Sequence, residues 1–192
     1  MDQLSSGQIW GVALVAVGLI ALIWIMATVN RFVKLRNHIK ESWSDVDVAL
    51  QRRHDLIPNL VATVKAYASH EQTLFEQIAR ERDQAILSSG NVSDRARDEA
   101  ALGQSVGTLM ARAEAYPQLK ASQNYLDLQR ELANTEDRIA AARRFYNANV
   151  RDYDTMLDSL PSSMIGRFMN YEAAPYFEVT EAAARDIPFA GS

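Results

Sequence analysis

The feature that most constrains this chain is an uninterrupted apolar stretch near its N-terminus, beginning at Ile9 and ending at Val29. It reads IWGVALVAVGLIALIWIMATV and contains no charged residue. As an α-helix it would extend about 32 Å, which matches a bilayer hydrocarbon core of about 30 Å. Trp10 and Trp24 lie near its two ends, where indole rings favour the membrane interface. The stretch predicts a single transmembrane helix.

Two other interpretations of this stretch fit less well. A cleaved secretory signal begins with basic residues, whereas this chain begins Met-Asp-Gln-Leu-Ser-Ser. A buried core helix that is apolar on every side would be unusual in so small a domain. No Lys or Arg precedes Arg31, which begins a basic flank containing four such residues by Lys40. By the positive-inside rule, we expect the N-terminus outside and the large domain in the cytoplasm.

The rest of the chain has the composition of a folded domain without thiol chemistry. From Arg31 onward, 20 basic residues face 23 acidic ones, giving a net charge of −3. Nucleic-acid binding needs a surplus of Lys and Arg, so it is not expected. The absence of cysteine excludes disulfides, thiolate metal sites and a cysteine nucleophile.

A long amphipathic pattern follows the apolar stretch. No glycine lies between Gly18 and Gly90, and the only proline in that interval is Pro58. Apolar residues recur every three or four positions, as on one face of a helix or coiled coil. Proline removes a backbone donor, so Pro58 predicts either a kink or a tight turn. The stripe comprises Phe32, Leu35, Ile39, Trp43, Val46, Leu50, Ile57, Val61, Val64, Ala68, Phe75 and Ile78.

The second half of the chain predicts further helices. Ser93 is a candidate N-cap for a helix over residues 94–116, and Pro117 suits the first turn of the next helix. That next helix is expected to run as far as Leu160, with an amphipathic turn at 162–169 and a loose tail from 178. We find no convincing strand pattern. The predicted class is all-α, with the transmembrane helix continuing into an antiparallel helical bundle.

Several polar residues fall on the predicted core faces, and they allow two interpretations. One is a metal or acid-base site built from His54, Asp55, Glu71 and Glu136. The other is a set of ion pairs that fix helix register. The second is favoured, because the chain has neither Glu-x-x-His nor His-Glu-x-x-His. We therefore expect no enzyme, cofactor or metal. The polar set is Arg53 or His54, Glu71, Gln129, Glu136 and Arg143.

Two blocks of sequence resemble the LemA family. The first covers residues 33–37 and 42–61 and contains the run QRRHDLIPNLV; the second covers residues 128–153. The resemblance extends over most of the chain, and an uninterrupted run is more specific than a spaced motif. The matching positions are Trp43, Asp47, Arg52, Arg53, His54, Asp55, Pro58, Asn59, Glu131, Glu136, Arg143, Tyr146, Asn147 and Tyr153.

The resemblance implies a bacterial inner-membrane protein. Residues 1–30 would form a short extracytoplasmic N-terminus and one transmembrane helix, residues 31–177 a cytoplasmic four-helix bundle, and residues 178–192 a loose tail. In that picture Pro58 ends one bundle helix and begins the next. It also implies a scaffold or adaptor without catalysis, whose partners are the bilayer, further copies of itself, and a membrane metallopeptidase or other membrane protein. A metal-binding or hydrolytic bundle and a transmembrane sensor remain alternatives.

Overall fold

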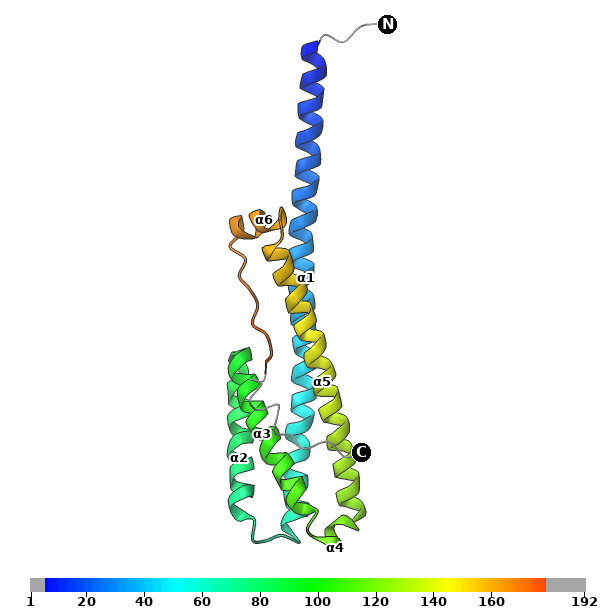
Figure 1. The fold of residues 1–192 in the computed structure, drawn as a ribbon, viewed down its shortest axis with the longest axis vertical. Coiled ribbons are helices and arrows are strands. Elements are labelled where there is room, and N and C mark those ends of the chain that lie inside the picture. The colour runs from blue at the N-terminus through cyan, green and yellow to red at the C-terminus, as the bar shows by residue number, and fades with distance from the viewer. Residues whose placement is uncertain (1–5, 179–192) are drawn as a thin grey trace. The chain divides into compact units, whose positions relative to one another are not determined.

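The computed structural model describes residues 6–178, and every regular element in this range is a helix (Figure 1). The prediction of an all-α protein is confirmed. The predicted loose tail lies outside the described residues, apart from Glu178. The elements are α1 (Ser6–Lys65), α2 (Gln72–Leu87), the 3-10 helix η1 (Ser88–Gly90), α3 (Val92–Ala113), α4 (Pro117–Lys120), α5 (Gln123–Asp158) and α6 (Ser162–Phe168).

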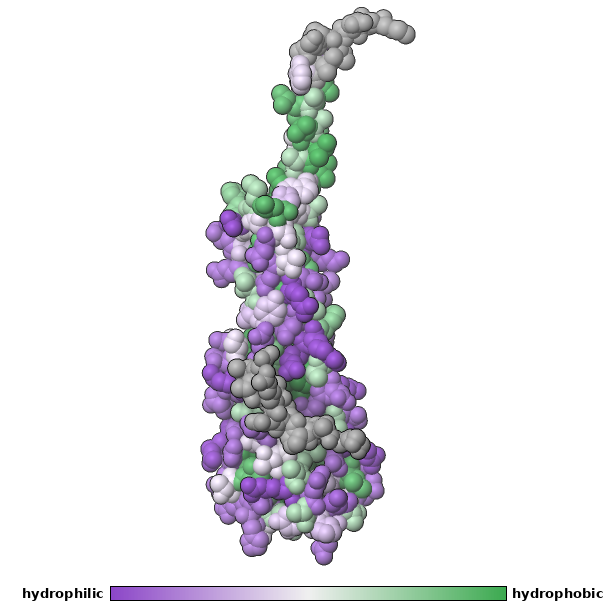
Figure 2. Space-filling view, viewed as in Figure 1, coloured by the Kyte–Doolittle hydropathy of each residue, from purple (hydrophilic) through white to green (hydrophobic). Residues whose placement is uncertain are grey.

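Helix α1 carries the apolar stretch and continues without a break into the amphipathic region. Its bulky apolar side chains are open to the surroundings: Trp10 is 71% exposed, Ile20 68% and Trp24 41% (Figure 2). Water-soluble helices bury such side chains, whereas a lipid-facing helix exposes them. Within residues 6–178, α1 alone is long and apolar enough to cross a membrane.

Pro58 lies inside α1, seven residues before that helix ends at Lys65. The expectation that it ends one bundle helix and begins the next is therefore wrong, as is a tight turn at this point. Proline lacks the N–H that would bond to the carbonyl of His54, four residues earlier. Arg82 Nε on α2 donates to that carbonyl oxygen at 2.9 Å. A side chain thus replaces the missing backbone donor, and the helix continues past the proline.

The chain divides into two compact units, which we describe separately. The anchor unit contains residues 6–40 and 149–174. The bundle unit contains residues 41–148 and 175–178.

The bundle unit is a four-helix bundle formed by α2, α3 and the portions of α1 and α5 that belong to it. Short connections join successive helices, which makes neighbours along the chain antiparallel. Apolar stripes from all four helices meet in one core, which the short helix α4 closes at one end with Leu119. Fully buried members include Leu60 on α1, Ile78 on α2, Leu102 and Leu109 on α3, and Tyr125 on α5.

Two predicted boundaries in this unit need correction. The N-cap of α3 is Asn91, whose side chain accepts a hydrogen bond from the Ser93 amide at 2.9 Å, so Ser93 is already helical. Pro117 does begin a helix, but this is the four-residue α4. The long helix starts again at Gln123, because the chain makes a turn at residues 121–122 that the apolar spacing did not reveal.

In the anchor unit, α5 and α6 pack against α1. Asn149 Nδ2 on α5 donates to the carbonyl oxygen of His38 on α1 at 3.4 Å. Farther toward the span, the ring of Phe32 meets that of Tyr153 edge to face at 6.0 Å, and that of Tyr171 at 5.0 Å. As residue numbers fall along α1 they rise along α5, so the two helices are antiparallel here.

Candidate functional site

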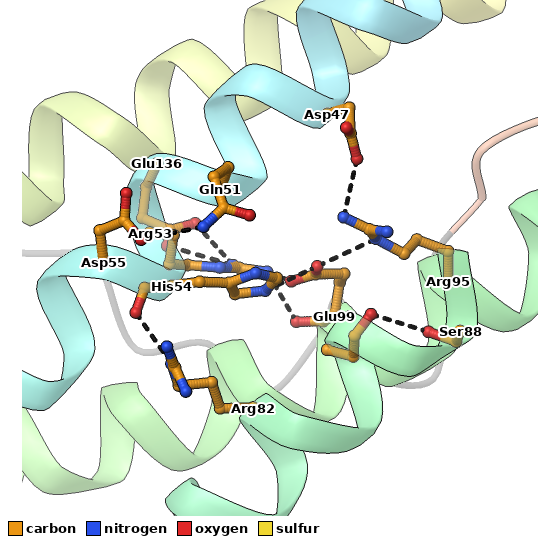
Figure 3. A network of polar contacts seen from close by, with 11 residues as sticks. Asp47, Gln51, Arg53, His54, Asp55, Arg82, Ser88, Arg95, Glu99 and Glu136 are labelled. Carbon is orange, nitrogen blue, oxygen red and sulfur yellow. Dashed lines mark hydrogen bonds and ion pairs between the residues drawn. The ribbon is translucent and has the colours of Figure 1, made fainter. Parts of the chain in front are cut away.

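The candidate site is a group of ionisable side chains inside the bundle unit. Arg53 and His54 lie on α1, and Arg95 and Glu99 lie on α3; none is more than 4% exposed. Arg53 and His54 reach the interior together because neighbouring residues of a helix can both flank one buried stripe. Figure 3 shows the four side chains converging between the helices. Buried charges are costly unless they are paired, so their partners decide what the site can do.

Glu99 is the centre of this ionic network. Its Oε2 accepts a charge-assisted hydrogen bond from Arg53 Nη2, which also donates to the backbone oxygen of Glu99 at 3.0 Å. Its Oε1 lies 2.9 Å from His54 Nε2 and 3.3 Å from Arg95 Nε. These last two nitrogens are at ion-pair distance but off hydrogen-bond alignment. One carboxylate therefore gathers three side chains from two helices.

The network extends to the other two helices of the bundle. Arg53 Nη1 lies 3.2 Å from Oε1 and 3.3 Å from Oε2 of Glu136 on α5. Arg95 Nη2 donates to Asp47 on α1 at 2.9 Å. Arg82 of α2 joins through the His54 carbonyl. All four bundle helices are thus tied to the same cluster.

The charges of the network hold one another in the ionised form. Burial by itself would raise the pKa of Glu99, but the contacts with His54 and Arg53 outweigh it and lower that pKa. Burial would likewise lower the pKa of Arg53, but Glu136 and Glu99 outweigh it and raise that pKa. A carboxylate with a lowered pKa is a poor proton acceptor. The electrostatics favour a structural role over acid-base chemistry.

The proposed metal or acid-base set is not brought together. His54 faces Glu99, and Glu136 faces Arg53. Asp55 is exposed and accepts a hydrogen bond from Gln51 on its own helix. Glu71 precedes α2 and pairs with Arg112 on α3. Among the described residues, no group of three or more His, Asp or Glu side chains is arranged to hold a metal ion.

The other motif residues fall into separate places. Arg52 and Glu131 form a partly exposed ion pair between α1 and α5. Pro58 and Asn59 are exposed on α1, and Arg143 is half-buried on α5, outside the network. Tyr153 belongs to the core of the anchor unit.

A second group of motif residues holds the segment that follows residue 174. The ring of Trp43 lies 5.4 Å from that of Tyr146 and 5.7 Å from that of Phe177. Tyr146 donates to the carbonyl of Pro175 at 2.8 Å. Asn147 both donates to the Phe177 carbonyl, at 3.1 Å, and accepts from its amide, at 2.9 Å. These residues therefore fix the described end of the chain to the bundle.

The predicted membrane-anchor residues lie in the anchor unit. Trp10, Trp24 and Arg31 are exposed on α1, and Val29 is partly buried. Ile9 is part of α1, but its side chain lies outside the described part of the structure.

Sequence reasoning missed Arg82, Arg95 and Glu99. A signal was present for the last two. In the helix predicted over residues 94–116, Leu102 and Val106 lie on one apolar stripe, and three residues before Leu102 the same face reaches Glu99. Arg95 lies one further turn back, at the i, i+4 spacing that allows an ion pair along a helix. Arg82 had no such signal, because its partner is a backbone carbonyl of a distant residue.

Comparison with known proteins agrees with the motif. The model of the LemA family matches residues 42–189, most of the chain. The protein belongs to the LemA family. The Arg53–Glu99 network thus lies within the part of the chain that defines LemA membership.

Curated relatives resemble the chain over most of its length. The magnetosome protein MamQ 2 of Paramagnetospirillum magneticum is 24% identical over 92% of this chain and 75% of its own length. The protein LemA of Metamycoplasma hominis is 21% identical over 82% of this chain and 72% of its own. Neither name denotes an enzyme. With the apolar part of α1, these likenesses describe a membrane-associated helical protein of the LemA family.

The pairing of Glu99 predicts a specific acid sensitivity. Because the pKa of Glu99 is lowered in the folded state, its contribution to stability is complete above the ordinary glutamate pKa of about 4.3. That contribution is lost as the pH falls from there through the lowered pKa. We expect the free energy of unfolding to fall more steeply over this acid range in the native protein than in Glu99→Gln. Urea unfolding at a series of pH values tests this, and a difference between the two proteins that does not vary with pH would contradict it.

The partner of the His54 carbonyl gives a second prediction. Arg82→Ala leaves this buried acceptor without a donor and is expected to cost about 1–3 kcal/mol. Pro58→Ala restores a backbone N–H to the same carbonyl, so Arg82→Ala should cost less in that background. Urea unfolding of the native protein, the two single variants and the double variant, all in a mild detergent, measures the coupling between the two substitutions. If Arg82→Ala lowers the free energy of unfolding equally with and without the Pro58→Ala substitution, Arg82 acts through something other than this carbonyl.

Proposed function

We propose that this protein is a membrane-anchored scaffold that self-associates or docks a membrane partner through its helical bundle. The main support is that the charges of the ionic network find their partners inside the protein. Arg53, Arg95 and Glu99 each meet an opposite charge inside the protein. These buried charges pair with one another and hold the helices in register, which suits a rigid platform better than a reaction site.

The anchoring part of the proposal rests on α1. Its exposed apolar stretch is followed by the basic residues Arg31 and Lys34, which are exposed on the same helix. We propose that the bundle lies on the cytoplasmic side of the bacterial inner membrane, with the N-terminus outside.

The proposed docking surface is formed by exposed apolar residues of the bundle unit. Phe145 on α5 is 59% exposed and Val48 on α1 is 68% exposed. Large apolar side chains left in water are enriched at protein interfaces. The partner classes are a second copy of the chain and another membrane protein, such as a metallopeptidase.

Cross-linking in intact membranes tests the scaffold. The chain has no cysteine, so Phe145→Cys and Val48→Cys each introduce a single reactive site. We expect these variants to give cross-linked products whose mass identifies either a dimer or a second protein. The neighbouring exposed site Arg144→Cys, which points about 100° away around the helix, is the matched control. A strictly monomeric protein in mild detergent, with no cross-linked product from either variant, would refute the scaffold.

A further inference from the structure

Helix α6 of the anchor unit leaves two bulky apolar side chains exposed, while Ile165 and two small residues face the core of the unit. Met164 is 67% exposed and Phe168 is 85% exposed, and their i, i+4 spacing places them on one face. Ser163 and Gly166, at i, i+3 spacing, are buried. A helix that packs in water usually has polar side chains on its outer face. The outward face of α6 is therefore suited to an apolar surrounding.

The buried face of α6 packs tightly against its neighbours, and this packing fixes the rotation of the helix about its axis. A Cβ atom on Gly166 would lie 2.9 Å from Leu157 Cδ2 and 3.6 Å from Phe32 Cζ. Rotating the helix to bury Phe168 would bring a large side chain into this space. At the C-terminal end, Asn170 has a positive φ of 51°, and the Tyr171 amide donates to the Gly166 carbonyl at 2.9 Å. This is the hydrogen bond of a Schellman cap, and it fixes where α6 stops.

The position of α6 along α1 supplies the second observation. Phe32, whose ring lies close to Gly166 of α6, is three residues beyond Val29, or about 4.5 Å along the helix. Thr28, inside the last turn of the apolar stretch, is only 7% exposed. The packing around α1 in the anchor unit thus reaches the end of the predicted span. Figure 2 shows hydrophobic surface at α6, next to the apolar part of α1.

The charges around α6 also suit a lipid surface. Arg167 is exposed beside Phe168, and Arg31 and Lys34 are exposed on α1 at the end of the span. Basic side chains near the end of a span favour anionic headgroups, and apolar side chains next to them can enter the acyl boundary.

We propose that α6 is a second membrane contact, which lies in the bilayer interface beside the transmembrane helix and inserts Met164 and Phe168. Leu160, just before α6, is also 80% exposed. The occupant is the lipid surface that receives α1, because this apolar surface adjoins the end of the span. The inference rests on the membrane anchoring in the proposed function and does not depend on any protein partner.

Depth measurements on the full chain test the contact. Single-cysteine variants Phe168→Cys and Met164→Cys are labelled with an environment-sensitive fluorophore and placed in nanodiscs of phosphatidylcholine and phosphatidylglycerol. We expect blue-shifted emission that brominated lipid quenches and iodide does not. The matched control is Arg151→Cys, an exposed site on α5 in the same unit about 10 Å before that helix ends, where iodide should quench.

A further variant separates this inference from the anchoring itself. Val17→Cys, 64% exposed in the middle of the apolar stretch, should be quenched by brominated lipid. If Val17 is quenched by lipid but Phe168 is as open to iodide as Arg151, the interfacial role of α6 is wrong and the anchoring stands. Shielding of Phe168 from both quenchers would mean that protein covers it, which also overturns the inference. If lipid quenches neither Val17 nor Phe168, both proposals fail.

Discussion

Arg53→Ala is expected to lower the free energy of unfolding of the bundle by about 3–5 kcal/mol. Removing this guanidinium leaves the buried carboxylate of Glu99 with less compensating charge and removes a donor to the Glu99 backbone oxygen. It also takes away the partner of Glu136 on α5. Most of the loss reflects the cost of a buried charge left under-compensated. Chemical unfolding in a mild detergent, followed by circular dichroism, measures it.

Arg52→Ala is the matched control for this prediction. Arg52 is the preceding residue on the same helix, and it also pairs with a glutamate of α5, but both side chains are about half exposed. Exposed pairs contribute about 0–1 kcal/mol, so this variant should be close to the native protein. Equal losses for the two variants would mean that burial of the network does not determine its contribution.

Phe32→Ala should lower the stability of the anchor unit by about 3–5 kcal/mol. Phe32 is fully buried and is the one residue of α1 whose ring meets both Tyr153 and Tyr171. Truncating it leaves a cavity at the point where α5, α6 and the following segment meet α1. Residues 149–171 should then lose protection in amide hydrogen exchange. Mass spectrometry of the protein in nanodiscs can follow that exchange.

Val33→Ala provides the comparison for Phe32. Val33 is the next residue of α1 and is 47% exposed, so its truncation removes little packing in this unit. We expect hydrogen exchange over residues 149–171 to match that of the native protein. Unchanged exchange in Phe32→Ala as well would show that the aromatic cluster does not hold α5 and α6 to α1.

The helical class and the membrane stretch were accessible from sequence because each depends on a local pattern. The stripe through Phe32, Val46 and Leu50 predicted a helix that continues directly from the apolar stretch, as α1 does. The positions where helices begin and end were harder to predict from the sequence. Helix α1 continues through Pro58, and Arg82 of α2 donates to the His54 carbonyl that the proline cannot serve. No local sequence pattern contains that arginine.

The candidate site was predicted in part, for the same reason. Arg53, His54 and Glu136 lay on predicted core faces, and the structure places them in or beside the network. Glu99 was missed, although it is the carboxylate that gathers the others, because two of its partners, Arg53 and His54, lie on a different helix. A stripe position shows that a side chain points inward, but it does not show which charge from another helix it will meet.

The sequence by itself determined that this protein is helical, that one segment suits a bilayer, and that it shares the LemA motif. These properties follow from hydropathy, helical spacing and residue identity along a continuous stretch. Only the tertiary structure decided three other features. Arg82 serves the His54 carbonyl that Pro58 leaves free, Glu99 pairs with Arg53 and Arg95, and α6 turns Met164 and Phe168 outward. Each of these depends on contacts between residues distant in sequence. How the helices pack decides which polar groups are buried and which partners they meet.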